Sequence, residues 1–257
     1  YNFPSNPTGG TLDEQQRNDL LAFAKKHDLW IISDEVYDRI VFEEDHVSFM
    51  GTGYDKLMVV NSFSKTFAMT GWRIGYILST NLEAMKQVVK IQYYISACSN
   101  DAMQYAVLEA MEKADDYPSI MAAEFQKRCN LIVDRLNAMP GVQCHRPKGA
   151  IYVFPKVDVP GMSSEEIAME LLKDGVLCSP GSAFGPSGEG HLRFAYTISQ
   201  EDIIRGMDKF RLRILQNGTD TFGVSAQSED HAVPVDPLLV DRIEILRGSS
   251  ALLHGGS

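Results

Sequence analysis

The alternation of hydrophobic and polar positions divides the first 80 residues into one helix and three short strands. A capping-box sequence from Thr11 to Glu14 predicts a helix that continues to about His27. Its inward-facing positions are expected to be Leu20, Leu21, Phe23 and Ala24. Short, nearly all-apolar runs then predict buried strands at 29–33, 57–61 and 73–78. Such strands, with a helix between them, are typical of an α/β sheet that is covered on both faces.

The second half of the chain is predicted to be helical first and then mixed. The first helix has an apolar stripe made of Leu82, Met85, Val88, Val89 and Gln92. Two more helices are expected, at about 100–113 and 119–139. Shorter elements follow, with strands at 150–154, 176–178 and 191–196 and helices at 163–173 and 199–215. Ser163 and Glu166 form a second capping-box sequence, and the alternation of elements predicts a small α+β unit.

Composition excludes several classes of protein. Of the 257 residues, 44% are hydrophobic and 23% are charged, values that favour a globular chain over a disordered one. The formal net charge is −10, so nucleic acid is not expected as a partner. The apolar runs are far shorter than the roughly 20 residues that span a bilayer. The four cysteines, Cys98, Cys129, Cys144 and Cys178, lack metal-binding spacing, so we expect buried, reduced thiols and no metal site.

A polar loop directly follows the second predicted strand. It presents the hydroxyls of Ser62 and Ser64, the amine of Lys65 and the guanidinium of Arg73. Ligands of open α/β sheets bind at the carboxyl ends of strands, where this loop lies. Hydroxyls and a guanidinium suit a phosphate group. A lysine beside a cation and partly out of water has a lowered pKa, which favours a role as an amine nucleophile.

Three further polar residues are candidates for the same site. Asp34 ends the preceding strand and is expected at the same sheet edge as Lys65, where it can hold a protonated ring nitrogen. Tyr37 follows three residues later, and Asn6 lies on a tight turn. Each also has an ordinary interpretation, since an aspartate at a strand end often caps a helix and a lysine is usually a surface residue. The joint pattern is more specific than any single residue.

The remaining aromatic and histidine residues near these motifs are expected to have no catalytic role. Packing is the expected role of Trp72, Tyr93 and Tyr94. The histidines His27, His46 and His191 show no ligand spacing and are interpreted as surface or incidental residues.

Over residues 1–216 the motifs resemble those of the class I/II aminotransferases, aspartate-aminotransferase-like enzymes that depend on pyridoxal phosphate and have fold type I. The matching segments, in chain order, are Asn6-Pro7-Thr8-Gly9, Asp34-Glu35-Val36-Tyr37, Ser62-Phe63-Ser64-Lys65 and Gly71-Trp72-Arg73-Ile74-Gly75-Tyr76. Further support comes from Lys148-Gly149-Ala150-Ile151-Tyr152-Val153-Phe154, Pro180-Gly181-Ser182-Ala183-Phe184-Gly185 and Leu192-Arg193-Phe194. The order and the spacing match as well as the residue types.

The resemblance implies a role for each candidate residue. Lys65 would form a Schiff base with the cofactor aldehyde and then carry a proton, and Asp34 would pair with the pyridine nitrogen. Asn6 and Tyr37 would hydrogen-bond the oxygen on the cofactor ring. Ser62, Ser64 and Arg73 would bind the phosphate. Arg193 would bind the substrate α-carboxylate through two parallel hydrogen bonds.

The resemblance also implies a fold and a division of the chain. Residues 1–80 would be the C-terminal part of the large cofactor domain, with a mixed, mostly parallel sheet covered by helices. Residues 81–216 would be connecting helices and a small α+β C-terminal domain. The family's N-terminal part, which completes the sheet and supplies phosphate contacts, is not in this sequence. We therefore expect unpaired strand edges, an uncovered apolar face and weak or absent cofactor binding by this chain alone.

The composition changes at about residue 217, where a second resemblance begins. Residues 217–257 contain no Lys and five Gly, and the segment 235–256 is similar to part of the plug domain of TonB-dependent outer-membrane receptors. A cytosolic enzyme and an outer-membrane plug belong to different compartments. The tail is therefore interpreted as foreign to the enzyme, through a fused or misassembled reading frame.

The leading hypothesis is a truncated aminotransferase that moves an amino group between an α-amino acid and a 2-oxo acid. A carbon–sulfur lyase or synthase on the same fold, an inactive binding module, and a receptor-plug fragment in the tail are the alternatives. The intact family members are homodimers, and a cytoplasmic location is expected. No nucleic-acid partner is expected, and no membrane partner for residues 1–216.

Overall fold

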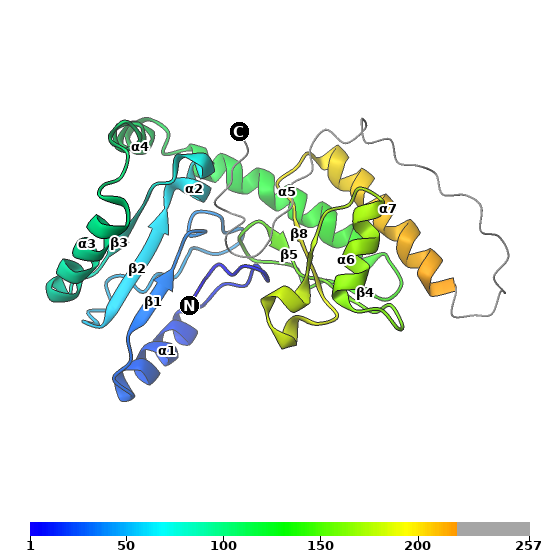
Figure 1. The fold of residues 1–257 in the computed structure, drawn as a ribbon, viewed down its shortest axis with the longest axis horizontal. Helices are drawn as coiled ribbons and strands as arrows, with labels where there is room; N and C mark the ends of the chain where they lie inside the picture. The colour runs from blue at the N-terminus through cyan, green and yellow to red at the C-terminus, as the bar shows by residue number, and fades with distance from the viewer. Residues whose placement is uncertain (220–257) are drawn as a thin grey trace. The chain divides into compact units, whose positions relative to one another are not determined.

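The computed structural model describes residues 1–219, and most of the predicted plug-like tail lies outside the described residues. The chain forms two compact units (Figure 1). Unit 1 consists of Tyr1–Cys129 and Arg146–Tyr152, and unit 2 consists of Asn130–His145 and the chain from Val153. No helix among the described residues is both long enough and apolar enough to cross a membrane.

Unit 1 contains a three-stranded sheet with the order β1-β2-β3. Its strands are β1 (Ile31–Asp34), β2 (Leu57–Ser62) and β3 (Gly75–Leu78). β1 runs parallel to β2, and β3 runs antiparallel to β2, so the predicted mixed α/β sheet is confirmed (Figure 1). The helices are α1 (Glu14–Lys26), the short α2 (Phe63–Thr66), α3 (Leu82–Ser96) and α4 (Asp101–Lys113), with a 3₁₀ turn at Thr70–Trp72. α5 (Tyr117–Asn137) continues from unit 1 into unit 2.

The helix α1 begins at a capping box two residues later than predicted. The Asp13 side chain accepts a hydrogen bond from Gln16 N at 2.7 Å, and the Gln16 side chain accepts one from Asp13 N at 3.0 Å. Thr11 and Glu14 do not form the box. Asp13 and Gln16, which have the same spacing, form it instead. Existence and approximate extent of the helix are confirmed, and only its cap was assigned wrongly.

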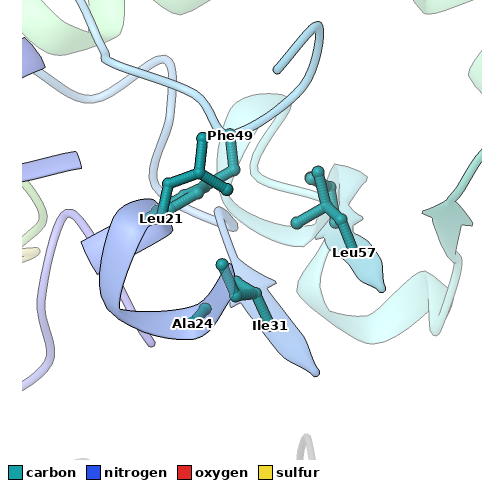
Figure 2. Close-up of a cluster of buried hydrophobic side chains, with 6 residues drawn as sticks. Leu21, Ala24, Ile31, Phe49 and Leu57 are labelled. Atoms are coloured by element: carbon teal, nitrogen blue, oxygen red, sulfur yellow. The ribbon is translucent and has the colours of Figure 1, made fainter. Parts of the chain in front are cut away.

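One face of the sheet packs against α1. Figure 2 shows Leu21 of α1 beside Phe49 and Ala24 of α1 beside Ile31 of β1, with Leu57 of β2 on the other side of the cluster. All of these side chains are at most 9% exposed. The prediction that Phe23 faces inward is wrong, since its side chain is 53% exposed. A helical turn of 3.6 residues places Leu21 and Ala24 on one stripe and rotates Phe23 away from it.

Within residues 1–219 the sheet is not covered on both faces, contrary to the expectation from its apolar strands. Ile32, which points away from the α1 side, is 55% exposed. In β3, Tyr76 and Leu78 are also exposed, because α1 packs over β1 and β2. The uncovered apolar surface expected from the resemblance is therefore present in the described chain.

The helices α3 and α4 carry much of the exposed apolar surface. α3 buries none of its residues, and Val107 is the buried residue of α4. The predicted stripe on α3 is solvent-exposed, with Leu82 at 74% and Val89 at 63%. Packing roles predicted for Trp72, Tyr93 and Tyr94 are also wrong within the described chain, where all three are exposed.

Unit 2 contains two small sheets flanked by helices. One pairs β4 (Val142–Gln143) with β6 (Lys156–Val157), and the other has the order β5-β8-β7, formed by Tyr152–Val153, Leu192–Ala195 and Ser179–Pro180. The helices are α6 (Ser164–Lys173) and α7 (Gln200–Thr219), with 3₁₀ turns at Gly181–Phe184 and Pro186–Gly188. The predicted Ser163 capping box of α6 is confirmed. No strand forms at the predicted range 176–178, and β7 begins directly after it, at Ser179.

The cysteines only partly match the predicted buried thiols. Cys129 and Cys144 are buried, whereas Cys98 is exposed on the segment between α3 and α4. Cys178 is partly buried, and desolvation raises its pKa to about 12. A thiol with such a pKa stays protonated at neutral pH and is a poor nucleophile.

Candidate active site

The carboxyl ends of β1 and β2 form the edge at which the predicted site residues lie. Asp34 is the last residue of β1 and pairs in register with Val60 of β2. β2 continues for two more residues to Ser62, and α2, which holds Lys65, follows at once. Asp34 and Lys65 therefore leave neighbouring parallel strands at the same edge, as the sequence predicts.

The segment that holds Asn6 also lies along this edge. Asn2 forms an isolated parallel bridge with Asp34, and its side-chain amide donates to Asp34 O at 3.3 Å. Asn6 N donates to the Asn2 Oδ1 atom at 2.8 Å, which ties the Asn6 turn back to the strand end. The structure thus brings Asn6 to the part of the fold where Asp34 lies.

The carboxyl group of Asp34 lies in a partly desolvated position. Burial raises its pKa above the ordinary value, and a hydrogen bond from Val36 N, at 3.3 Å from Oδ1, only partly offsets this effect. A carboxylate that has lost hydration without full compensation gains most from a cationic partner. A protonated ring nitrogen would be such a partner.

Tyr37 connects the loop after β1 with the lysine. Its ring is 5% exposed, and the Lys65 Nζ atom lies 6.0 Å from the ring centroid. The Tyr37 hydroxyl donates a hydrogen bond to the hydroxyl of Tyr152 at 3.1 Å. The structure therefore places the predicted nucleophile against the face of a residue predicted to contact the same ligand.

The three residues predicted to bind phosphate lie between the end of β2 and the start of β3. The Ser62 Oγ atom accepts a hydrogen bond from Ser64 N at 3.3 Å, so Ser62 also caps α2. Arg73 has a left-handed backbone with φ of 53°, and its Nη1 atom donates to Thr70 O at 2.8 Å. Ser62 pairs with Gly75 across β2 and β3, which brings Arg73, two residues before Gly75, toward the same loop.

Gly75 permits this close approach of β3 to the loop. A Cβ atom built at Gly75 would lie 2.7 Å from Asn61 O and 3.1 Å from the Ser62 Cβ atom. Cβ atoms do not approach backbone oxygens that closely, so a larger residue here would push β3 away from the end of β2.

Arg193 belongs to unit 2, where β8 holds it. Its Nη2 atom donates to the Ser179 Oγ atom of β7 at 3.0 Å. The guanidinium carbon lies 4.9 Å from the centroid of the Phe184 ring. A planar guanidinium held against an aromatic face can still offer its edge to a carboxylate.

A buried carboxylate that the sequence did not single out lies next to Asp34. Glu35 is 3% exposed and accepts hydrogen bonds from Ser33 Oγ at 2.8 Å and Phe49 N at 3.1 Å. Its other oxygen lies 2.9 Å from His46 Nε2. His46 is therefore not an incidental surface residue, since its side chain is 14% exposed and ion-pairs with Glu35 when protonated. The histidine lies only 11 residues after Glu35, but a spacing of 11 residues across a loop does not match a helix or strand repeat. No sequence pattern therefore indicates the contact.

Replacing Glu35 with glutamine should change the dependence of stability on pH. Burial alone would raise the pKa of Glu35, but hydrogen bonds, chiefly from His46 and Ser48, outweigh it and hold the pKa below the ordinary value. A carboxylate with a lowered folded pKa stabilises the fold above its unfolded pKa, and this contribution is lost as pH falls through the folded pKa. We expect Glu35→Gln to cost about 1–3 kcal/mol at neutral pH.

Urea denaturation at neutral pH and at pH values near 4 and below measures this difference. The gap between wild type and Glu35→Gln should narrow as pH falls, because the wild-type carboxylate becomes protonated. Burial raises the pKa values of Asp34 and Asp38, so their contribution to stability grows as pH falls. This contribution is present in both the wild type and the variant, so it cancels when the two free energies of unfolding are compared. A gap that is independent of pH would contradict the assigned role of the charge.

A hollow on unit 1 lies away from this edge. It has a volume of about 520 Å³, and its lining includes Asp38, Arg39 and His46. Neither Asp34 nor Lys65 lines it. Among the described residues, no group of three or more His, Cys, Asp or Glu side chains could hold a metal ion. The candidate site is therefore the edge formed by the ends of β1 and β2.

Comparison with known proteins identifies two family models. Residues 1–210 match the model described as Aminotransferase class I and II. Residues 197–257 match the model described as TonB-dependent Receptor Plug Domain, which overlaps the end of the first match and includes the tail. The second match begins at residue 197, before the predicted boundary at 217, and it includes α7, which starts at Gln200.

The relatives that match the chain are aminotransferases with different names. The chain is 37% identical over 212 residues to an aspartate aminotransferase of Pyrococcus horikoshii, a match that covers 81% of this chain and 54% of that protein. It is 35% identical over 215 residues to a probable N-acetyl-LL-diaminopimelate aminotransferase of Bacillus subtilis, covering 83% and 54%. The chain thus spans about half the length of these relatives.

A solved structure shows the same fold. The aromatic aminotransferase from Pyrococcus horikoshii superposes with a TM-score of 0.79 and 35% sequence identity. The superposition covers 84% of this chain and 59% of that chain. The likeness therefore extends over most of this chain.

Proposed function

Because the chain belongs to the class I and II aminotransferase family, we propose that it is part of an enzyme that moves an amino group between an α-amino acid and a 2-oxo acid. Enzymes of this family depend on pyridoxal 5′-phosphate. The observation that carries the proposal is the placement of Asp34 and Lys65 at the ends of adjacent parallel strands, with Tyr37 against the lysine. This edge offers one amine and one desolvated carboxylate to a single ligand.

The residues at this edge fit the chemistry of pyridoxal phosphate. Desolvation raises the pKa of Asp34, which means that burial disfavours the ionised carboxylate. A protonated pyridine nitrogen would be a cationic partner that stabilises it. The hydroxyls of Ser62 and Ser64 and the guanidinium of Arg73 would hold the phosphate. Tyr37 and Asn6 would hydrogen-bond the oxygen on the ring. When bound, the cofactor withdraws electrons from the substrate carbon that loses a proton.

The chain's own groups perform the remaining tasks. The Lys65 amine is the base that takes the proton from the substrate α-carbon and returns a proton to complete the transfer. The lysine is partly buried and lies over the Tyr37 ring, which would limit the access of water to the amine. In unit 2, the Arg193 guanidinium, held by Ser179 and Phe184, would bind the substrate α-carboxylate.

Covalent trapping of the cofactor tests this proposal even if binding is weak. The purified chain is mixed with excess pyridoxal phosphate and reduced with borohydride, and the modified lysine is mapped by peptide mass spectrometry. We expect the label at Lys65 above the chain's other lysines. A label spread evenly over exposed lysines would contradict the proposal.

Product identification distinguishes the proposed reaction from a lyase on the same fold. An aminotransferase yields a 2-oxo acid and passes the amino group to an acceptor, whereas a carbon–sulfur lyase releases ammonia and a thiol. The named relatives act on different amino acids according to their names, so we propose only the class of α-amino acid substrates. We propose no role for the tail in this reaction.

We further propose a cytoplasmic homodimer. The support for an association of copies is the exposed apolar surface of α3, in which none of the residues is buried in the described chain. Exposed apolar patches of this extent mark interaction surfaces. Sedimentation equilibrium of the purified protein and fractionation of cells that produce it test the two statements, and a monomer at all concentrations would contradict the first.

A further inference from the structure

We propose that Tyr152 is a positioning residue that fixes the hydroxyl of Tyr37. Tyr152 lies in a segment that matches the family pattern, but neither the sequence nor the proposed reaction gives it a task. This inference rests on the proposed function, in which Tyr37 contacts the cofactor. Tyr152 would act on the cofactor only through Tyr37.

The contact between the two tyrosines is direct and buried. Their hydroxyl oxygens lie 3.1 Å apart, and their ring centroids lie 5.9 Å apart at an interplanar angle of 82°. Tyr37 is 5% exposed and Tyr152 is 6% exposed. An edge-to-face pair of rings at this distance is favourable, and a buried hydroxyl without a partner is costly. Both effects hold the two side chains in one arrangement.

The backbone fixes the position of Tyr152 relative to the loop that holds Tyr37. Ala150 N donates to Ile40 O at 2.9 Å, and Ile40 N donates to Tyr37 O at 2.8 Å. One residue earlier, Gly149 approaches so closely that a Cβ atom built there would lie 2.7 Å from Ile40 O. Backbone hydrogen bonds therefore hold the segment before Tyr152 on the loop that contains Tyr37. They fix the positions from which the two tyrosine side chains meet.

The hydroxyl pair has a chemical consequence for Tyr37. A phenol hydroxyl can donate one hydrogen bond and accept others. With a ligand oxygen present, Tyr37 donates to the ligand while it accepts from Tyr152. Accepting a hydrogen bond polarises the Tyr37 O–H bond and makes it a stronger donor. Tyr152 thereby orients the Tyr37 proton toward the ligand and strengthens that contact.

The same pair also restrains the surface on which Lys65 lies. The lysine Nζ atom is 6.0 Å from the centroid of the Tyr37 ring, so a rotation of this ring would move the neighbour of the amine. The edge-to-face contact with Tyr152 opposes such a rotation. Tyr152 therefore restrains the Tyr37 ring and, through it, the surroundings of the Lys65 amine.

A double-mutant cycle on stability tests the contact without any cofactor. The variants are Tyr37→Phe, Tyr152→Phe and the double variant, which keep both rings, and Tyr105→Phe on the exposed surface of α4 is the control. Each single change should raise the unfolding equilibrium constant about three- to tenfold, and the double variant should add little to either. Tyr105→Phe should leave the constant unchanged. Additive effects of the two changes would overturn the proposal.

A second readout separates positioning from a merely structural role. Bound pyridoxal phosphate has an absorption band that changes with pH, and a donor to its ring oxygen lowers the midpoint of that change. Tyr37→Phe should raise the midpoint. Tyr152→Phe should raise it by about half a pH unit or more in the wild type and not at all in the Tyr37→Phe background. Equal shifts in both backgrounds would overturn action through Tyr37.

Together with borohydride trapping, the stability cycle and the midpoint shift distinguish failure of this inference from failure of the proposed function. Borohydride labelling that is spread evenly over the chain's lysines overturns the proposed function and the positioning role, whatever the stability cycle gives. Trapping at Lys65 together with additive stability effects overturns the inference alone. Trapping, coupling in stability and a midpoint shift that disappears in Tyr37→Phe support both.

Discussion

Replacing Lys65 with alanine is expected to remove covalent cofactor trapping at this position and to lower amino transfer by about 10²–10⁴-fold or more. The reason is that in the proposed reaction the base and the nucleophile are the same amine, which lies in α2 directly after β2 and over the Tyr37 ring. Trapping is measured by mass spectrometry, and transfer by the absorbance change when an amino acid is added. Lys26→Ala, on the exposed surface of α1, is the matched control and should behave like the wild type.

Lys65→Arg keeps the positive charge and separates two explanations. A guanidinium stays protonated at all accessible pH values, so it is neither a base nor an amine nucleophile. The arginine variant should therefore be as inactive as the alanine variant. If Lys65→Arg retained most of the activity, the lysine would contribute only charge, and its assignment as the base would be wrong.

Replacing Phe49 with alanine is expected to lower the free energy of unfolding by about 3–5 kcal/mol. Phe49 is 1% exposed and lies in the cluster between α1 and the sheet (Figure 2). Removing its ring leaves a cavity beside Leu21 and Leu57, whose positions are set by a helix and a strand that cannot collapse freely. Urea denaturation measures the change.

Phe23→Ala is a control of the same residue type on the neighbouring helix. Its ring is 53% exposed, and its ring contact is with His27 at 4.6 Å. Surface substitutions usually change stability by no more than about 0.5 kcal/mol. Comparable losses for both variants would indicate that Phe49 is not a core residue of unit 1.

The elements with a strong local signal could be predicted from the sequence. The strands β1 and β2 are short apolar runs, and α1 and α6 begin at capping boxes, so local chemistry alone locates them within a few residues. Burial was harder to predict, because it depends on what covers each face. Ile32 and Val89 have the same apolar character as buried residues, but no local pattern shows that nothing in the described chain packs on them.

The site shows a similar division. The placement of Asp34 and Lys65 at one edge follows from two strand ends and the usual geometry of parallel sheets. The hydrogen bond between Tyr37 and Tyr152 joins residues 115 positions apart, and no local pattern in the sequence indicates such a contact. The contact of His46 with Glu35 has the same cause, a loop that folds back onto the end of β1.

The discontinuity of unit 1 has a consequence for biosynthesis. Proteins emerge from the ribosome from the N-terminus, and domains generally fold as they become complete. The strip Arg146–Tyr152 belongs to unit 1 but leaves the ribosome only after the residues 130–145 of unit 2. Until then Tyr37 lacks Tyr152, and Ile40 O lacks its donor from Ala150. A nascent chain that stalls near residue 129 therefore exposes an unfinished surface to chaperones and proteases, although the strands that hold Asp34 and Lys65 have already been synthesised.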